Sequence, residues 1–241
     1  MEYPEITTSE LKLLLNKQGI KIIDARPIDA YNGWKLNGEI RGGHIKSAKS
    51  LPVKWTNYMD WIEIVDSKNI SKEEKIIIYG YNENQISQVA DTFKRNEFNN
   101  IHIYPHFIDE WVKDKTLPME KLARYKNLVY AQWVKDVIDG KIPPEHNGGK
   151  TIICHAHYRN RDAYLSGHIP GAIDIDTLAL ESPETWNRRS PDELKASLEK
   201  HGITSDTTVI IYGKFMHPNN DDEFPGSAAG DIGAIRCAAI M

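Results

Sequence analysis

The chain has 241 residues, enough for one large domain or two ordinary ones. Hydrophobic residues make up 40% and charged residues 27%, a balance typical of a soluble globular protein rather than a disordered one. The formal net charge is -4, and both signs are mixed along the chain. The chain therefore lacks the basic surface expected of a protein that binds nucleic acid or an anionic membrane. Apolar runs are only a few residues long, so no transmembrane span is predicted.

The first residues, MEYPEITTSEL, lack the basic and apolar regions of a secretory signal. Two cysteines, Cys154 and Cys237, do not make a disulfide framework, and both suit burial in a core. Cys154 and His155 would face opposite sides of a strand and cannot share a metal ion. We therefore expect a cytoplasmic protein without a metal or an organic cofactor.

In the first half of the chain, Thr7 and Glu10 form a capping box that begins a helix through residue 15. KIIDA, residues 21–25, is a predicted strand. IIIY, residues 76–79, suits a strand buried on both faces of a parallel sheet. The remaining predicted elements are a helix over 85–95, a strand over 101–104 and a helix around 108–113.

In the second half, a helix over 131–139 precedes the strand TIICHA, residues 151–156. Ser190, Pro191 and Glu193 indicate a helix start, and that helix should end at Gly202. The strand TVIIY and the final helix GAIRCAAIM follow. Strands that alternate with helices predict an α/β fold with parallel sheets.

The two halves repeat one another. DAY begins at residues 29 and 162 and YG at residues 79 and 212, both 133 residues apart. GHI, at residues 43 and 167, recurs after 124 residues, because the first copy has a longer excursion over residues 32–42. Ordered matches of this kind predict a duplicated domain. We place the first domain at residues 1–124 and the second at residues 125–241.

These stretches resemble the rhodanese family of sulfurtransferases in a tandem arrangement. The resemblance is carried by IIDARPIDAY and GGHIKSA in the first copy, and by YRNRDAYLSGHIPGAIDID and WNRRSPDELKASLEKHGITSDTTVIIYG in the second. It implies two domains, each with a parallel sheet of the five-stranded type flanked by helices. It also implies that a cysteine thiolate takes a sulfane sulfur from a donor such as thiosulfate and passes it to a thiophilic acceptor.

The chain departs from this family at the catalytic position. The cysteine would directly follow a buried strand, in a loop whose backbone N–H groups stabilise the thiolate. Gly80 and Gly213 stand there instead. The first copy's loop has no arginine, and Glu83 would oppose a bound anion. The second copy has a long insertion over residues 214–231. We therefore expect this chain alone to be inactive with thiosulfate and cyanide.

The second copy also ends early, because only 28 residues follow Gly213. A sheet that lacks its next strand would expose an edge. We expect the chain to be the front part of a longer sulfurtransferase whose missing C-terminal domain carries the cysteine and binds a small sulfur-donor anion and a thiol acceptor. A sulfur-carrier protein is a candidate partner. The alternative is a catalytically inactive rhodanese pair that acts as a docking or regulatory module.

Several motif residues are expected to have structural roles. The resemblance implies a pair between Asp24 and Arg26, and Arg159 is the counterpart of Arg26, although His157 replaces the aspartate. His44 and His168, in the two GHI turns, are expected to stabilise those turns rather than act as bases.

The insertion leaves two alternatives open. Its small residues, 226–231, precede the predicted final helix and could bind an anion through backbone N–H groups or pack against the next domain. Lys214, His217, Ser227 and Gly230 are the candidate anion-binding or cleft-lining residues. The acidic residues 219–223 lack the spacing of a calcium loop.

Overall fold

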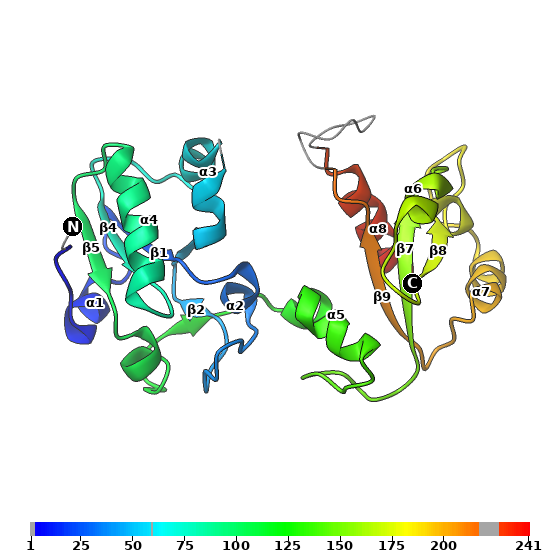
Figure 1. Ribbon diagram of the computed structural model, residues 1–241, viewed down its shortest axis with the longest axis horizontal. Coiled ribbons are helices and arrows are strands. Elements are labelled where there is room, and N and C mark those ends of the chain that lie inside the picture. The colour runs from blue at the N-terminus through cyan, green and yellow to red at the C-terminus, as the bar shows by residue number, and fades with distance from the viewer. Residues whose placement is uncertain (1–2, 59, 217–226) are drawn as a thin grey trace. The chain divides into compact units, whose positions relative to one another are not determined.

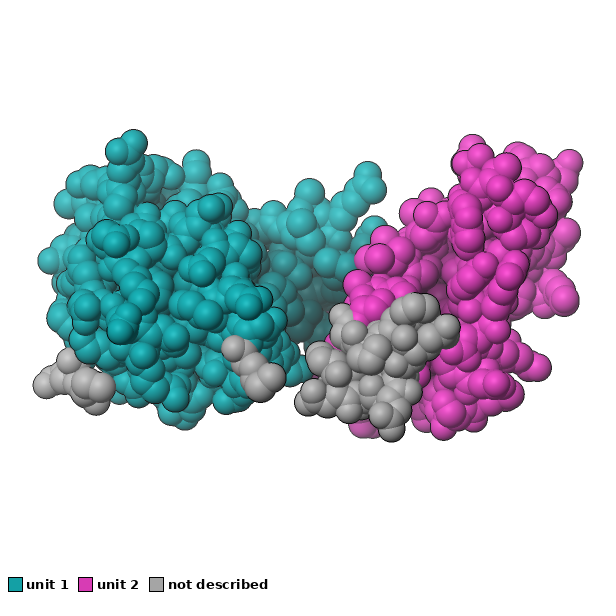
Figure 2. Space-filling model, turned by 90° about the horizontal axis from the view of Figure 1, so that it is seen from above, with its two compact units in different colours: residues 1–130 teal, residues 131–241 magenta. Residues whose placement is uncertain are grey.

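The computed structural model describes residues 3–58, 60–216 and 227–241. The chain divides into two compact units, Met1–Tyr130 and Ala131–Met241, which Figure 2 shows in teal and magenta. The division lies a few residues beyond the predicted boundary after residue 124. None of the helices in the described ranges is long and apolar enough to cross a membrane.

Unit 1 is built on a four-stranded parallel sheet with the order β3-β1-β4-β5 (Figure 1). Its strands are β1 (Ile20–Asp24), β3 (Lys49–Ser50), β4 (Lys75–Tyr79) and β5 (Ile101–Tyr104). A single parallel bridge from Glu5 to Ile103 extends the sheet beyond β5. The short strands β2 (His44–Ile45) and β6 (Met119–Glu120) pair with each other in antiparallel fashion.

The helices of unit 1 are α1 (Thr8–Leu14), α2 (Ile28–Asn32), α3 (Trp61–Ser67) and α4 (Glu83–Arg95). The predicted capping box is confirmed, because the Glu10 carboxylate accepts the Thr7 backbone N–H at 2.7 Å and the Thr7 hydroxyl accepts the Glu10 N–H at 3.2 Å. The helix predicted around residues 108–113 is a single π-helical turn, Phe107–Trp111.

The strand β4 is buried on both faces, as its apolar run predicts. On one face, Ile76 and Ile78 join the apolar cluster that contains Trp61 of α3 and Phe93 of α4. On the other face, Ile77 packs in the cluster formed by α1 and the π-helical turn. Period-two alternation therefore divides one strand between two cores.

The longer loop over residues 32–42 contacts the last residues of unit 1, near residues 125–130. The Trp34 ring contacts the rings of Tyr125 and Tyr130 edge-on, at centroid distances of 5.2 and 5.4 Å. The Trp34 indole N–H donates to the Leu128 carbonyl at 2.8 Å. These contacts give a structural reason for the longer first copy.

Unit 2 contains a three-stranded parallel sheet with the order β8-β7-β9. Its strands are β7 (Thr151–His157), β8 (Ile173–Asp176) and β9 (Thr208–Gly213), and its helices are α5 (Ala131–Ile138), α6 (Arg161–Ser166), α7 (Pro191–Lys200) and α8 (Ala229–Ile240). A second capping box, between Ser190 and Glu193, begins α7 as predicted. In the part of the chain that the structure describes, β9 pairs only with β7.

The two faces of this sheet differ in polarity. Cys154, Ala156 and Ile175 face an apolar core that α8 completes with Ala234 and Cys237. The opposite face carries polar side chains, because the strand register places His155 beside Asp174 and His157 beside Asp176. The end of β7 therefore presents imidazole and carboxylate groups on one face of the sheet.

The final helix begins earlier than predicted, which corrects the interpretation of residues 226–231 as a loop. Helix α8 starts at Ala229, so Gly230 lies in its first turn. A Cβ atom on Gly230 would lie 2.0 Å from the Lys214 carbonyl oxygen, and one on Gly213 would lie 2.0 Å from the Gly230 carbonyl oxygen. Paired glycines therefore let the helix start directly against the end of β9.

Candidate functional site

The carboxyl ends of parallel strands are the places where α/β proteins gather ligands and catalytic groups. In unit 1, Gly80 follows β4 directly, and Asn82 caps α4 by accepting the Gln85 backbone N–H at 3.0 Å. A Cβ atom on Gly80 would approach only side-chain atoms, at 3.2 Å from Ile86 and 3.4 Å from Gln85. The catalytic position of unit 1 has room for a side chain but carries none.

A buried ionic network fills the space beside Gly80. The Arg26 guanidinium donates to both Asp24 carboxylate oxygens, at 3.0 and 2.7 Å, and to the Gly43 carbonyl at 2.7 Å. Its remaining terminal nitrogen lies 3.5 Å from the Glu39 carboxylate. All three charged side chains are fully buried. The bidentate pair with Asp24 and the second carboxylate neutralise the charge of this arginine, which disfavours the binding of an added anion.

Two tyrosines close the network. The Tyr79 hydroxyl donates to Asp24 at 2.7 Å, and the Tyr81 hydroxyl donates to Glu39. Burial and the hydrogen bond to Glu39 raise the pKa of Tyr81 above its ordinary value, so the hydroxyl remains a donor. Burial, the largest single influence, would lower the pKa of Arg26, but the Asp24 charge, the neighbouring Tyr79 and the hydrogen bonds to Asp24 together outweigh burial and raise that pKa.

The loop amide next to Gly80 is also occupied, because the Tyr81 backbone N–H donates to the Gln85 side chain at 3.0 Å. A persulfide anion needs unpaired N–H donors and a positive field. In unit 1 the Tyr81 and Gln85 N–H groups already have partners, and Glu83 adds a negative charge to the first turn of α4. Glu39 and Tyr81 were not predicted as site residues, since neither lies in a motif.

In unit 2, the catalytic position is sterically closed. Gly213 ends β9 and touches the backbone of Gly230, so a cysteine side chain there would collide with α8. Of the predicted insertion residues, Lys214 contacts Gly230 through its backbone, and the Ser227 hydroxyl accepts the Ala229 N–H at 3.0 Å. His217 and residues 219–223 lie outside the described residues.

Arg159 does not reproduce the arrangement of Arg26. It is exposed, with φ at 53°, and its backbone N–H donates to Asp176 at 3.1 Å. His157 occupies the place of Asp24 and lies 3.5 Å from Asp174 and 3.9 Å from Asp176. An imidazole cannot offer the two carboxylate oxygens that hold Arg26, so a buried arginine would have no comparable partner here.

His44 and His168 have closely similar surroundings in the two units. His44 stacks on Tyr31 with ring centroids 3.7 Å apart, and a ring nitrogen lies 2.8 Å from the Tyr31 carbonyl oxygen. His168 stacks on Tyr164 at 4.0 Å, with a ring nitrogen 2.9 Å from that residue's carbonyl oxygen. Both imidazoles hold the turn after the preceding helix.

The two thiols are packed in the apolar core of unit 2, with exposed fractions of 0% for Cys154 and 1% for Cys237. Burial raises the pKa of Cys154 to about 12 and that of Cys237 to about 11. Neither is a thiolate near neutral pH. Within the described ranges, His, Cys, Asp and Glu side chains form no group of three or more that could hold a metal ion.

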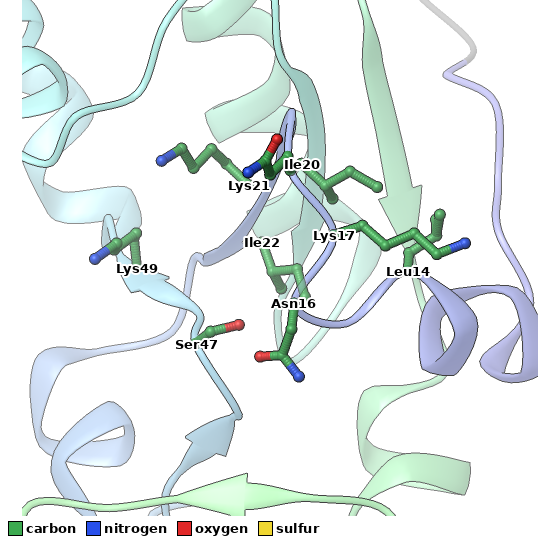
Figure 3. A pocket seen from close by; sticks show the side chains of 9 residues that line it. Leu14, Asn16, Lys17, Ile20, Lys21, Ile22, Ser47 and Lys49 are labelled. Atoms are coloured by element: carbon green, nitrogen blue, oxygen red, sulfur yellow. The ribbon is translucent and has the colours of Figure 1, made fainter.

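A cavity of about 250 Å³ lies at the amino end of β1, away from the strand-end loops. Lys17, Lys21 and Lys49 line it together with Asn16 and Ser47, but Figure 3 shows the Lys17 side chain pointing away from those of Lys21 and Lys49. Lys21 is also paired with Glu74 at 3.5 Å. The lysines do not converge on a common point where an anion would bind.

Known proteins are similar to this chain over most of its length. The Rhodanese-like domain family matches the chain twice, over residues 7–114 and 132–222. The thiosulfate sulfurtransferase YnjE of Escherichia coli strain K12 is 34% identical over 208 residues, which cover 84% of this chain and 46% of that protein. The sulfur carrier protein TtuD of Thermus thermophilus is 23% identical over 189 residues, 68% of this chain and 65% of that protein.

Solved structures of EanB are also similar. The anaerobic ergothioneine biosynthesis enzyme from Chlorobium limicola, in complex with its natural substrate trimethyl histidine, is 57% identical with a TM-score of 0.91. The match covers 99% of this chain and 56% of that one, so the chain spans about half the length of EanB and of the Escherichia coli enzyme. Because the family model matches the chain twice and covers most of its length, the chain belongs to the Rhodanese-like domain family.

Proposed function

We propose that the protein is a sulfurtransferase that delivers sulfane sulfur from a cysteine persulfide to the imidazole ring of trimethyl histidine, with ergothioneine as the product. The observation that carries this proposal is the 57% identity to EanB across 99% of the chain. EanB has been solved with hercynine, with ergothioneine and, in one variant, as a cysteine persulfide in a tetrahedral intermediate state.

The atoms and electrons of the proposed sulfur transfer balance without an external oxidant. The terminal sulfur of the persulfide forms a bond to a ring carbon of the acceptor as the S–S bond breaks. The ring carbon loses its proton, and the released cysteine thiolate takes one up. The cysteine is then recharged by a donor such as thiosulfate or the persulfide of a sulfur-carrier protein, which supplies the oxidised sulfur.

The 241 residues are proposed to act as the non-catalytic part of this enzyme. Gly80 and Gly213 offer no nucleophile, and Cys154 and Cys237 are buried thiols whose pKa values of about 12 and 11 keep them protonated. The persulfide cysteine is therefore proposed to lie outside these residues. Unit 1, with its closed Arg26 network, is best suited to a structural role.

The test compares the native protein with the isolated 241-residue chain. Each is given trimethyl histidine and a polysulfide or thiosulfate donor, and ergothioneine is measured by mass spectrometry. We expect product from the native protein only, and unchanged turnover per folded enzyme in Cys154→Ala and Cys237→Ala variants. Turnover with thiosulfate and cyanide but none with trimethyl histidine would contradict the proposal that trimethyl histidine is the sulfur acceptor. If the native protein is inactive in both assays, the alternative function, a catalytically inactive docking or regulatory module, would be favoured.

A further inference from the structure

An exposed aromatic pair stands at the carboxyl end of the sheet in unit 2. Tyr158 directly follows β7, and its ring lies 5.3 Å from that of Trp186, centroid to centroid, at an angle of 51°. The exposed fractions are 44% for Tyr158 and 49% for Trp186. Two large rings that contact each other yet remain half open to solvent offer aromatic faces to a ligand.

The backbone holds Trp186 in a defined position. Its N–H donates to the Ser182 carbonyl at 2.8 Å, and its carbonyl accepts from the Arg236 guanidinium at 3.0 Å. Arg236 is in turn paired with the buried Glu181 carboxylate at 2.5 Å. The ring is therefore presented from a fixed turn between β8 and α7, a favourable arrangement for recognition.

One carboxylate lies at the same strand end as this pair. Asp176 accepts the backbone N–H of Arg159, the residue after Tyr158, at 3.1 Å and that of Leu178 at 3.0 Å. Asp174 is paired with the exposed Arg161 at 3.1 Å. The His157 side chain, 6% exposed, lies between the Asp174 and Asp176 carboxylates, and among the described residues neither ring nitrogen has a hydrogen-bond partner. The Arg159 guanidinium lies 5.1 Å from the Tyr158 ring centroid, a cation–π contact whose place a bound ammonium group would take.

We propose that Tyr158 and Trp186, with the Asp176 carboxylate at the same strand end, form a subsite for a quaternary ammonium group. Such a group carries a fixed charge and has no N–H to donate, so aromatic faces and nearby carboxylates are the groups that recognise it. The inference rests on the proposed function, because the trimethylated amino group of the proposed acceptor is a ligand of this class. The subsite would hold the end of the acceptor remote from its reacting ring.

The first experiment measures binding without catalysis. The native protein, labelled with ¹⁵N-tryptophan, is titrated with choline and with its neutral isostere 3,3-dimethylbutanol. The Trp186 indole signal is assigned by its absence from Trp186→Phe. We expect choline to shift this signal to saturation and the isostere to leave it nearly unchanged. Tyr158→Leu should weaken choline binding by about tenfold, whereas Tyr158→Phe, which keeps the ring, should retain it.

The matched control is Tyr58→Leu, which removes a tyrosine of similar exposure, 42%, from unit 1 and should leave the titration unchanged. An equal shift with the neutral isostere would overturn the proposal, as would a Trp186 signal that does not respond to choline. An equal loss of binding in the Tyr58 variant would also overturn it, because the response would not then be local.

The second experiment separates the subsite from the proposed function. With active enzyme, Tyr158→Leu should raise KM for trimethyl histidine about tenfold, with KM for the sulfur donor unchanged. Activity toward histidine, which lacks the three methyl groups, should change little. Ergothioneine formation with an unaltered KM would reject the subsite and keep the function. An absence of ergothioneine formation would reject the function, while the choline titration would still decide the subsite.

Discussion

Replacing Gly213 with alanine should destabilise unit 2 far more than the equivalent replacement of Gly80 destabilises unit 1. The two glycines occupy the same position in the two copies, so each serves as the control for the other. At Gly213 the new Cβ would lie 2.0 Å from a backbone oxygen of Gly230, and ordinary contact begins at 3.4 Å. The first turn of α8 would therefore have to retreat by roughly 1.4 Å.

That retreat would disturb the packing of Ala234 and Cys237 in the core of unit 2. Overpacking of this kind costs about 1–3 kcal/mol. At Gly80 the nearest atoms belong to the side chains of Ile86 and Gln85, at 3.2 and 3.4 Å, which small rotations can relieve. The free energy of unfolding of unit 1 should then change by no more than about 0.5 kcal/mol.

Hydrogen exchange read by mass spectrometry resolves the two units within one chain. In Gly213→Ala, peptides from β9 and α8 should lose about fivefold to a hundredfold in protection, while peptides from β4 and α4 keep theirs. In Gly80→Ala, protection should be close to that of the native chain throughout. Equal effects in the two variants, or no loss at β9 and α8, would refute the steric argument.

Other substitutions test the remaining features. Arg26→Met should lower the free energy of unfolding of unit 1 by about 3–5 kcal/mol in denaturant titrations, because two buried carboxylates lose their cation, and a loss below about 1 kcal/mol would contradict this reasoning. Gly80→Cys should give no turnover with thiosulfate and cyanide, because Gly80 is buried and the adjacent Tyr81 N–H is already paired, and measurable turnover would show that the loop can stabilise a persulfide. Burial, followed by the charges of His157 and His168, lowers the pKa of His155, so the unfolded state binds this proton more readily than the folded state. The stability of unit 2 should then be fully present above a pH of about 6.5 and fall as the pH decreases below it. His155→Ile should flatten this dependence relative to the native chain, and an unchanged slope would exclude His155 as its source.

The fold was largely predictable because its signals are local. Capping boxes at Thr7 and Ser190 involve groups three residues apart, and both begin helices as predicted. The alternation of strands and helices depends on short apolar periods. The start of α8 was placed incorrectly, because glycines are poor helix formers and the favourable contact of Gly230 is with a strand distant in sequence.

The candidate sites were predictable only in part. The sequence alone determined that the chain contains two related domains and that a glycine, not a cysteine, stands at both strand ends. It did not reveal that Glu39 and Tyr81 meet Arg26, since these residues are separated by loops whose path depends on tertiary packing. Nor did it reveal why the two glycines differ, one open to a side chain and the other closed by a helix. Local order follows from neighbouring residues, whereas the neutralisation of a charge or the closure of a strand end requires groups that only the folded chain brings together.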